Sequence, residues 1–278
     1  MEITRFAPSP TGFLHLGHAF AAMYAYKAAT INGKFLLRIE DIDLYRCNKI
    51  YEESIYIDLD WLGINWEKPV LKQTNNKKKY SEAIDKLDKL GLVYPCFCSR
   101  SKVNKEISYS LSAPQGKIYK TYSGRCRSLS SKEIKERKKN NEKFCLRLNM
   151  KKAINYCGKD LTFFEKKLGE VKINPSIFGD IILSRKDINT SYHISVTIDD
   201  SIQGISLVTR GKDLFESTYI HRLLQSLLNL STPKYDHHDL ILDNNGKKLS
   251  KRDSSISIKS IRESGKPSKE IIEELSKY

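Results

Sequence analysis

The chain has 278 residues, of which 40% are hydrophobic and 29% are charged. This length and apolar content allow one large core or two smaller ones, and they argue against a disordered or fibrous protein. The formal net charge of +15 is compatible with a phosphate-rich partner, because clustered Lys and Arg release counterions when they dock on nucleic acid. Lysine is abundant along the whole chain, so a solvated basic surface accounts for the charge equally well.

The first residues carry no recognisable targeting signal. Met1 and Glu2 precede a short mixed segment in place of a basic and then apolar stretch. No apolar run approaches the roughly 20 residues that a membrane helix needs. We therefore expect a cytoplasmic protein without a membrane span. In that compartment the six cysteines are expected to be reduced thiols or metal ligands and not disulfides.

Alternating strand and helix patterns open the chain. Residues 3–6 are predicted to form a buried strand, and the prolines and glycine of residues 7–12 a loop. A helix that stops at Asn32-Gly33 follows. Its apolar side chains recur at helical spacing, at Leu16, Ala19, Phe20, Met23 and Tyr26. Residues 35–39 form the next predicted strand, and this βαβ unit predicts an α/β fold with a parallel, Rossmann-like sheet.

Further along, helices are predicted near residues 51–62 and 80–90. Cysteine- and serine-rich sequence then begins at Tyr94, and we interpret it as an insertion with one strand at 144–148. Regular segments return at 178–183, 192–198 and 205–209, before a helix at about 215–230; these would make the second half of the sheet. We divide the chain into four predicted parts. Residues 1–93 form the first half of the α/β domain, 94–175 the insertion, 176–235 the second half, and 236–278 a C-terminal segment that ends in a short helix.

The first motif with chemical meaning is His15-Leu16-Gly17-His18, at the first strand-to-helix turn. In an open α/β sheet such a turn is where phosphates meet a helix N-terminus. Gly17 would let a nucleotide approach the backbone closely, and the imidazoles of His15 and His18 can donate hydrogen bonds as charge develops at an α-phosphate. On its own, the motif fits two helix-start histidines bonded to backbone or solvent equally well.

The second motif is the KLSKR segment at residues 248–252. Lys248 and Lys251 could hold the β- and γ-phosphates of ATP as fixed cations do in other phosphoryl chemistry. Alone, a solvated basic turn is the simpler interpretation in a lysine-rich chain. The two motifs together, at opposite ends of a domain of this size, predict an enzyme that uses ATP to form an adenylate, with His15, His18 and Lys251 as catalytic residues and Gly17 and Lys248 also binding ATP.

With these motifs, several other segments resemble the glutamyl-tRNA synthetase family of class I aminoacyl-tRNA synthetases. The resemblance spans roughly residues 3–252 and includes residues 5–12, 38–43, 199–200 and 209–211. It implies a class I catalytic domain and a ligase that activates glutamate with Mg²⁺-bound ATP. The chain ends soon after the KLSKR segment, so we expect no anticodon-binding domain. A catalytic domain of this kind resembles the glutamyl-Q tRNA(Asp) synthetases, which activate glutamate without tRNA and attach it to queuosine in the anticodon of tRNA(Asp).

Four residues match the zinc site of that branch, which has the form CxC followed by YxxxC. They are Cys96, Cys98, Tyr122 and Cys126. Spacing alone predicts zinc less strongly, since CxC is less typical than CxxC and tyrosine is a rare ligand. Thiolates suit Zn²⁺, and four ligands would close one structural, tetrahedral site that pins a loop-rich insertion. The remaining three cysteines have no matching role.

The predicted glutamate pocket rests on charge. Glutamate brings two carboxylates and one ammonium, so a selective site needs at least two cations and one anion. The resemblance assigns the carboxylates to Arg5 and Arg210 and the α-amino group to Glu40, with Ser9 and Tyr192 completing the pocket. The alternatives are that Arg5 is a surface residue and that Tyr192 packs in the core.

Asp41 and Asp43 accompany Glu40 at the end of the second predicted strand. Three neighbouring carboxylates repel one another, so such a strand end is more often functional than structural. We therefore expect this acidic end in the site.

The leading hypothesis is a monomeric ligase whose partners are ATP, L-glutamate and queuosine-containing tRNA(Asp). One alternative is a C-terminally truncated glutamyl-tRNA synthetase that charges tRNA(Glu). Another is a HxGH-type nucleotidyltransferase acting on a small molecule without tRNA, which would leave the paired arginines unexplained. A third is a non-catalytic RNA-binding paralogue, which the intact HxGH and KLSKR motifs argue against.

Overall fold

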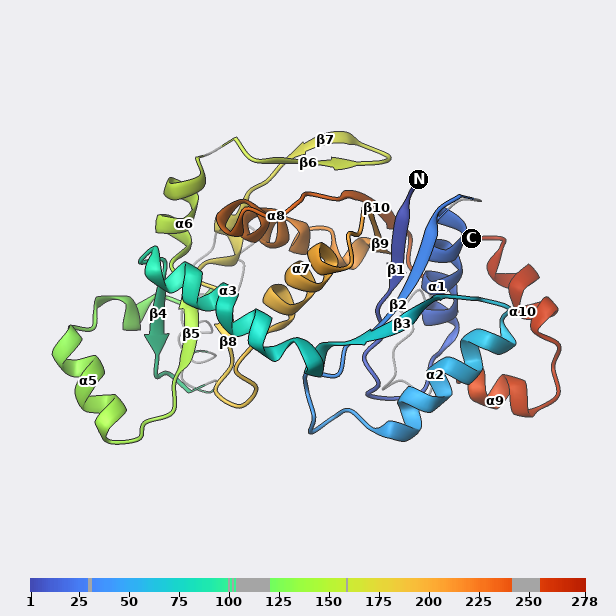
Figure 1. Cartoon of the computed structure of the whole chain (residues 1–278), viewed down its shortest axis with the longest axis horizontal. Coiled ribbons are helices and arrows are strands. Elements are labelled where there is room, and N and C mark those ends of the chain that lie inside the picture. The colour runs from blue at the N-terminus through green and yellow to red at the C-terminus, as the bar shows by residue number, and fades with distance from the viewer. Residues whose placement is uncertain (30–31, 100, 102, 104–120, 159, 242–255) are drawn as a thin grey trace, which may run out of the picture.

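The computed structural model of the chain describes most of its length. The described residues are 1–29, 32–99, 101, 103, 121–158, 160–241 and 256–278. The molecule is elongated, with α5 near one end and the C-terminal helices α9 and α10 at the other (Figure 1). The KLSKR segment lies outside the described residues. Within the described part, none of the helices is both long and apolar enough to cross a membrane.

The first half of the fold is the predicted βαβ unit. Strand β1 (Ile3–Phe6) leads through α1 (Leu16–Ala28) to β2 (Lys34–Ile39), and the two strands pair in parallel. Strand β3 (Glu67–Lys72) adds to the other side of β2, also in parallel, to give the order β1-β2-β3. The parallel sheet predicted from the sequence is therefore confirmed.

The two helices predicted after this unit are also present. Helix α2 (Lys49–Trp61) begins at Asn48, whose side chain accepts the Ile50 N–H, and it gives way to Gly63 at a φ of 69° that favours glycine. Helix α3 (Lys77–Lys89) buries its apolar face and exposes its lysines. Both follow the helical spacing of their apolar residues.

The second half of the sheet consists of β9 (Leu207–Gly211) and β10 (Lys234–His238), which pair in parallel. Helix α7 (Tyr192–Ile202) precedes β9, and α8 (Ser217–Leu228) connects the two strands. The assignment of residues 192–198 to the sheet was wrong, because they form the start of α7. The assignment of residues 178–183 to it was also wrong, because the strand found there belongs to a separate antiparallel sheet. Strand β10 was not predicted.

The two halves meet where β1 lies beside β9. The N–H of Ser206 donates to Ile3 O at 3.0 Å, and the N–H of Ile3 donates to Ser206 Oγ at 2.8 Å. We call this junction the β1–β9 seam. The strand order across it is β3-β2-β1-β9-β10, with connections running outward in both directions. In open α/β sheets, ligands bind outside the carboxyl ends of the strands at such a switch point.

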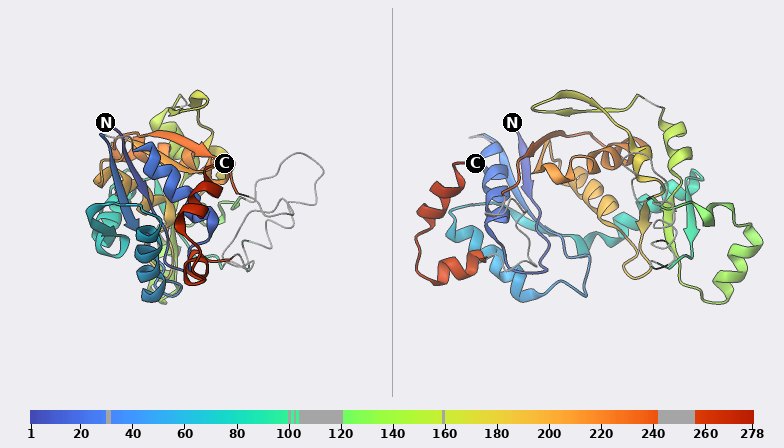
Figure 2. Two further views of the ribbon diagram at one scale, coloured as in Figure 1. Left: turned by 90° about the vertical axis from the view of Figure 1, so that its right-hand side faces the viewer. Right: turned by 180° about the vertical axis from the view of Figure 1, so that it is seen from behind.

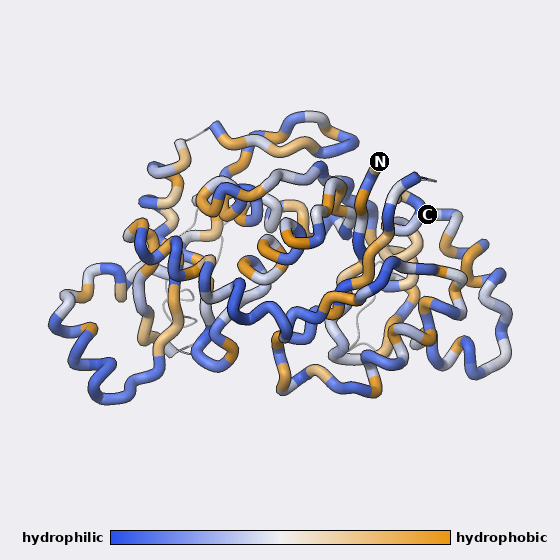
Figure 3. Tube along the Cα trace, in the orientation of Figure 1, coloured by the Kyte–Doolittle hydropathy of each residue, from blue (hydrophilic) through white to orange (hydrophobic). Residues whose placement is uncertain are grey.

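A separate antiparallel sheet combines strands from the predicted insertion, residues 94–175, with one strand that follows it. Strands β4 (Val93–Cys96), β5 (Cys145–Leu148) and β8 (Ile182–Ser184) form an antiparallel sheet, and β5 confirms the strand predicted at 144–148. Helix α5 (Ser131–Lys139) projects at the end of the molecule and is mostly hydrophilic (Figure 3). Helix α6 (Met150–Cys157) follows β5.

A hairpin formed by β6 (Thr162–Glu165) and β7 (Gly169–Lys172) extends the second parallel sheet. Glu165 pairs in parallel with Tyr235 of β10, giving the order β7-β6-β10-β9. Figure 2 shows the hairpin reaching from the α6 end of the molecule toward the N-terminal strand. Part of the sequence interpreted as an insertion therefore supports the main sheet directly.

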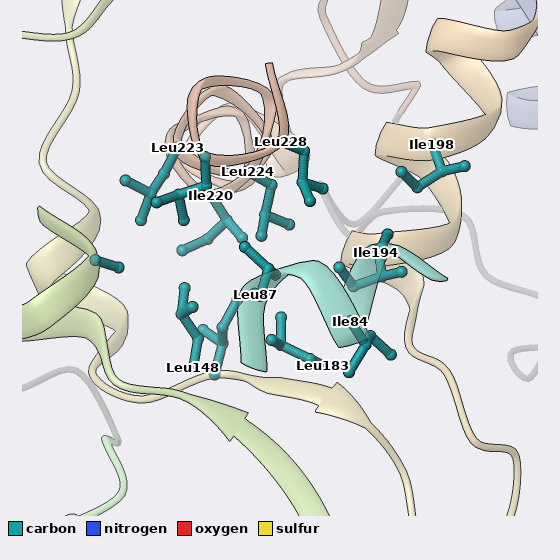
Figure 4. Close-up of a cluster of buried hydrophobic side chains, with 14 of the residues drawn as sticks. Ile84, Leu87, Leu148, Leu183, Ile194, Ile198, Ile220, Leu223, Leu224 and Leu228 are labelled. Carbon is teal, nitrogen blue, oxygen red and sulfur yellow. The ribbon is translucent and has the colours of Figure 1, made fainter. Parts of the chain in front are cut away.

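One large hydrophobic core joins these parts. Its side chains come from α3, β5, β8, α7 and α8, and the central ones are drawn in Figure 4: Ile84, Leu87, Leu148, Leu183, Ile194, Ile198, Ile220, Leu223, Leu224 and Leu228. Because this core mixes residues from both sides of position 175, the division of the chain into domains stays a prediction.

A second core packs α1 and α2 against the C-terminal helices α9 (Ile258–Glu263) and α10 (Ser268–Leu275). Ile258 is fully buried, and its N–H donates to Leu14 O at 2.8 Å. The C-terminal segment is therefore attached beside the turn that carries the HxGH motif. Short 3₁₀ turns complete the described structure at Gln73–Asn76, Arg125–Ser128, Pro175–Phe178 and Lys212–Leu214.

Candidate active site

A cavity of about 440 Å³ opens at the carboxyl ends of the strands on both sides of the β1–β9 seam. It is lined by residues that end or directly follow β1, β2, β9 and β10, and by the start of α1 and α7. Eight of the residues predicted from the sequence line it: Arg5, Ser9, His15, Gly17, His18, Glu40, Tyr192 and Arg210. Lys248 and Lys251 lie outside the described residues.

The two histidines of the HxGH motif cap helix α1. His15 Nδ1 accepts the Gly17 N–H at 3.1 Å, and His18 Nδ1 accepts the His15 N–H at 3.3 Å. The centroids of the two imidazole rings are 3.8 Å apart. Because both Nδ1 atoms accept, each neutral ring carries its proton on Nε2, where it can donate to an anion. A Cβ on Gly17 would lie 3.1 Å from His15 Cε1, so glycine at this position keeps the first histidine in place.

Behind the cavity, two arginines share one carboxylate. Arg5 Nε and Arg38 Nη1 lie 2.9 and 2.6 Å from Asp200 Oδ1. Arg38 Nη2 also lies 3.1 Å from Glu40 Oε1. Two cations and two anions therefore balance in this cluster. Arg5 is only 5% exposed, so the structure rules out the alternative that it is a surface residue.

The electrostatics of the cluster follow from this pairing. Burial raises the pKa of Asp200, but the guanidinium groups of Arg5 and Arg38 outweigh it and lower that pKa to about 2. Burial also raises the pKa of Glu40, while Arg38 opposes the rise. Asp200 is thus a fixed anion that orients both arginines. Glu40 lines the cavity, as does a second acidic residue, Asp213, next to the end of β9.

Arg210, on the β9 side of the seam, has a different environment. Its guanidinium donates to Thr218 Oγ1 at 2.6 Å and to nitrogen atoms of His221 and His237 at 3.1 and 3.2 Å. No carboxylate of the described residues forms an ion pair with it. Tyr192 stands beside these groups, with its ring centroid 5.6 Å from that of His221. Tyr192 lines the cavity and does not pack only in the core.

The other acidic residues of the motifs have structural partners. Asp41 accepts the backbone N–H and the hydroxyl of Thr74 at 2.9 and 2.6 Å. Asp43 pairs with Arg46 and Arg185. Of the three carboxylates at the end of β2, therefore, only Glu40 lines the cavity.

Asp199, beside the fixed anion Asp200, is likewise occupied. It accepts hydrogen bonds from Gln73, Asn76 and Tyr80. These contacts tie α7 to the start of α3 and leave Asp200 alone as the carboxylate of this pair that faces the arginines.

Three cysteines gather at the end of β4 and in the 3₁₀ turn at Arg125–Ser128. The sulfur atoms of Cys96, Cys98 and Cys126 lie within 4.8 Å of one another. Cys98 and Cys126 are 3.5 Å apart, close to the roughly 3.8 Å between thiolates that bind one zinc ion at about 2.3 Å. Tyr122 Oη lies 3.6 Å from Cys98 Sγ. The donor set suits Zn²⁺, and the three thiols could hold a metal.

Sequence reasoning missed several polar residues of the site. Arg38 and Asp200 fell inside recognised motifs but received no role. His221, His237 and Glu165 were not singled out at all. The usable signal was the polar run His237-His238-Asp239 just before the apolar residues 240–242, since polar residues at the carboxyl end of a parallel strand commonly face a ligand.

The comparisons with known proteins agree with this geometry. The family model described as tRNA synthetases class I (E and Q), catalytic domain, matches residues 3–278. The chain is 44% identical to the Glutamyl-Q tRNA(Asp) synthetase of Rhodobacter capsulatus, covering 95% of each chain. It is 37% identical to the enzyme of that name from Nitratidesulfovibrio vulgaris, covering 83% of it. It is 38% identical to the Glutamate--tRNA ligase of Aquifex aeolicus, of which it covers 54%.

Among solved structures, the glutamate tRNA ligase of Elizabethkingia meningosepticum in complex with its amino acid matches with a TM-score of 0.74 and 29% identity. That match covers 91% of this chain and 52% of the ligase, so the chain spans about half of its length. The methionyl-tRNA synthetase of Mycobacterium tuberculosis, with a TM-score of 0.55 and 9% identity, shares the fold alone. The chain therefore belongs to the class I tRNA synthetases (E and Q) and is a ligase of the aminoacyl-tRNA synthetase type, with glutamyl-Q tRNA(Asp) synthetases among its relatives.

Proposed function

We propose that this enzyme activates L-glutamate with ATP without needing tRNA, and then transfers the glutamyl group to queuosine in the anticodon of tRNA(Asp). The observation that carries the proposal is the cavity, where Arg5, Arg210 and Glu40 present the charges that glutamate requires. The relative with 44% identity over 95% of both chains is named a Glutamyl-Q tRNA(Asp) synthetase, which supports this acceptor.

In the first step an oxygen of the glutamate α-carboxylate attacks the α-phosphorus of Mg²⁺-bound ATP. The bond from that phosphorus to the bridging oxygen breaks, and pyrophosphate leaves. His15 and His18 are proposed to donate their Nε2–H groups to phosphate oxygens, because their Nδ1 atoms are committed to the cap of α1. Lys248 and Lys251 are proposed to bind the β- and γ-phosphates.

The pocket residues position glutamate for that attack. Glu40 is proposed to bind the α-ammonium, and Arg5 and Arg210 the carboxylates, with Ser9 and Tyr192 completing the contacts. In the second step a hydroxyl of the queuosine cyclopentene diol attacks the carbonyl carbon of the adenylate. AMP leaves with the electron pair of the broken bond, and the hydroxyl proton is released.

The acceptor can be identified by labelling. With labelled glutamate, ATP and the full chain, we expect label on tRNA(Asp) from cells that make queuosine and none on tRNA(Asp) from cells that cannot. The label should resist removal of the tRNA 3′ terminus, because the anticodon base and not the terminal ribose carries it. Glutamate-dependent exchange of pyrophosphate into ATP, without tRNA, should accompany it.

Other results would select other functions. Label at the 3′ end of tRNA(Glu) would identify a glutamate–tRNA ligase, as the 38% identical relative is named. Exchange without label on any tRNA would identify a small-molecule nucleotidyltransferase. Absence of any exchange would contradict glutamate activation itself.

We also propose that Cys96, Cys98, Tyr122 and Cys126 hold one structural Zn²⁺. The protein, purified without a metal-affinity tag, should contain about one zinc ion per chain. Cys126→Ser should lose most of that zinc on dialysis against a chelator and should unfold at a lower temperature, because metal binding contributes directly to folding free energy. Metal content by mass spectrometry and thermal unfolding check both points.

Cys157→Ser is the matched control, because Cys157 lies in α6, outside the cysteine cluster. Its zinc content should equal that of the unchanged protein. Less than about half an equivalent of zinc in the unchanged protein would argue against a structural site.

A further inference from the structure

The guanidinium of Arg210, on the β9 side of the cavity, donates its hydrogen bonds among the described residues to uncharged acceptors. Arg210 donates Nε–H to His237 Nε2, one Nη1–H to His221 Nδ1 and one Nη2–H to Thr218 Oγ1. Each Nη nitrogen carries two N–H groups, so one on each has no acceptor among the described residues. Arg210 lines the cavity, so these N–H groups can donate to the oxygens of an anionic ligand there.

The protonation of His237 follows from this contact. An arginine can only donate, so His237 Nε2 must be unprotonated. The ring proton is then on Nδ1, which donates to Glu165 Oε2 at 2.6 Å. Glu165 Oε1 accepts the backbone N–H of the same histidine at 3.1 Å. Both residues are buried, at 1% and 2% exposure, so the carboxylate fixes the tautomer of the imidazole without competition from water.

His221 is arranged in the same way. Its Nδ1 accepts from Arg210, so its proton is on Nε2 and is donated to His193 Nδ1 at 3.2 Å. Burial, and next the neighbouring Arg210 charge, lower the pKa of His193 to about 4 and that of His237 to about 3. The same two causes lower the pKa of His221 well below its ordinary value. The imidazoles that surround Arg210 are therefore neutral near pH 7.

The contrast with Arg5 shows what this arrangement does. Arg5 is paired with Asp200 in a cluster whose charges balance. Arg210 is oriented as firmly, by three hydrogen bonds, but its positive charge is not cancelled by a contacting carboxylate of the described residues. A neutral acceptor can thus hold a guanidinium in place and still leave its charge to a ligand.

We propose that Glu165 and His237 are a positioning pair for Arg210: Glu165 fixes the tautomer of His237, which then orients the guanidinium so that it selects an anionic side-chain group. This inference rests on the proposed function only in taking glutamate as the substrate. It assigns a role in substrate selection to the β6–β7 hairpin through Glu165, which lies 72 residues before His237 in the chain.

Glu165→Gln tests the pair with little change of shape. The amide oxygen would still accept the His237 backbone N–H, but its NH₂ group would then face Nδ1 and displace the proton to Nε2, against the Arg210 Nε–H. We expect the KM for glutamate in pyrophosphate exchange to rise about tenfold or more, as for loss of a hydrogen bond to a charged group. The KM for ATP and the inhibition constant of glutamine should change by less than about twofold.

Glu170→Gln is the matched control. It makes the same charge change on β7 of the same hairpin, where the Glu170 side chain is exposed and accepts a hydrogen bond from Thr162 Oγ1 at 3.5 Å. Its kinetic constants should equal those of the unchanged enzyme. An unchanged KM for glutamate in Glu165→Gln, or an equal weakening of glutamate and glutamine, would overturn the proposal.

The tautomer can be read without substrate. In the full chain labelled with ¹⁵N-histidine, the His237 signals, identified by their loss in His237→Gln, should show a neutral ring protonated on Nδ1. In Glu165→Gln the proton should move to Nε2. A wild-type ring protonated on Nε2 would refute the pair, whereas missing label on tRNA(Asp) would refute only the proposed acceptor.

Discussion

Replacing Asp200 with asparagine should lower the free energy of unfolding by about 3–5 kcal/mol. Its carboxylate is the shared partner of Arg5 and Arg38, with contacts of 2.9 and 2.6 Å, and all three side chains are less than a tenth exposed. An amide would leave two buried guanidinium groups, of which Arg38 would keep its ion pair with Glu40 and Arg5 would have no ion pair among the described residues. Chemical denaturation followed by circular dichroism measures the loss.

The matched control is Asp160→Asn, because Asp160 pairs with Lys172 where both side chains are well exposed. Such surface pairs contribute about 0–1 kcal/mol, so stability should hardly change. The pH dependence gives a second check. The pKa of Asp200 is lowered from 3.8 to about 2, so its stabilisation is present above pH 3.8 and is lost as the pH falls through 2. The gap between wild type and Asp200→Asn should close only in that range; a gap that closes near neutral pH would contradict the ion pairs.

Replacing Arg210 with glutamine should reduce kcat/KM for glutamate in pyrophosphate exchange at least about a hundredfold. Removing one partner of a buried charge pair costs about 3–5 kcal/mol, because the other charge is left desolvated and unpaired. Free glutamine, tested as an inhibitor, carries no side-chain charge. Its inhibition constant should therefore change much less than the KM for glutamate. The ratio of the glutamate KM to the glutamine inhibition constant is the informative measurement.

Arg137→Gln provides the control for charge. Arg137 lies near the end of α5, outside the residues that line the cavity, where it pairs with Glu142 and packs over the Phe97 ring. Pyrophosphate exchange involves no tRNA that could contact it. Its kcat/KM should stay within about twofold of wild type. An equal loss with glutamate and glutamine in Arg210→Gln would contradict a role in recognising the side-chain carboxylate.

The fold was predictable where apolar residues repeat with the period of one element. Helices α1, α2 and α3 each have one buried face, so their spacing identified them. Helix α7 was assigned to the sheet because Ile194, Val196 and Ile198 alternate as in a strand. In the structure every residue from Ile194 to Asp200 is buried, so α7 has no exposed face to set a helical pattern.

Strand β10 escaped prediction for the opposite reason. Its buried residues include Asp236, His237 and His238, which look like surface residues in the sequence. Their burial is possible because partners distant in the chain satisfy them, as Tyr24 does for Asp236 at 2.9 Å. Side-chain networks of this kind depend on tertiary contacts, and no local pattern encodes them.

The candidate site divides in the same way. Most of the predicted residues that line the cavity stand in short motifs, so the resemblance identified them one by one. The residues behind them do not: Glu165 and His237 meet only because β6 pairs with β10. Motifs thus predict which side chains face a ligand, while the groups that set their charge and orientation need the structure.

The β1–β9 seam has a mechanical consequence. On each side of it the strands pair along backbone ladders. Across it, Ser206 bonds to Ile3 at the start of β1, and the Arg5 guanidinium donates to Thr209 O at 3.1 Å. Arg5 lies in β1 on one side of the seam, and Arg210 lies in β9 on the other side. A substrate bound by both would therefore add a further connection between the two half-sheets, at the carboxyl ends of their strands.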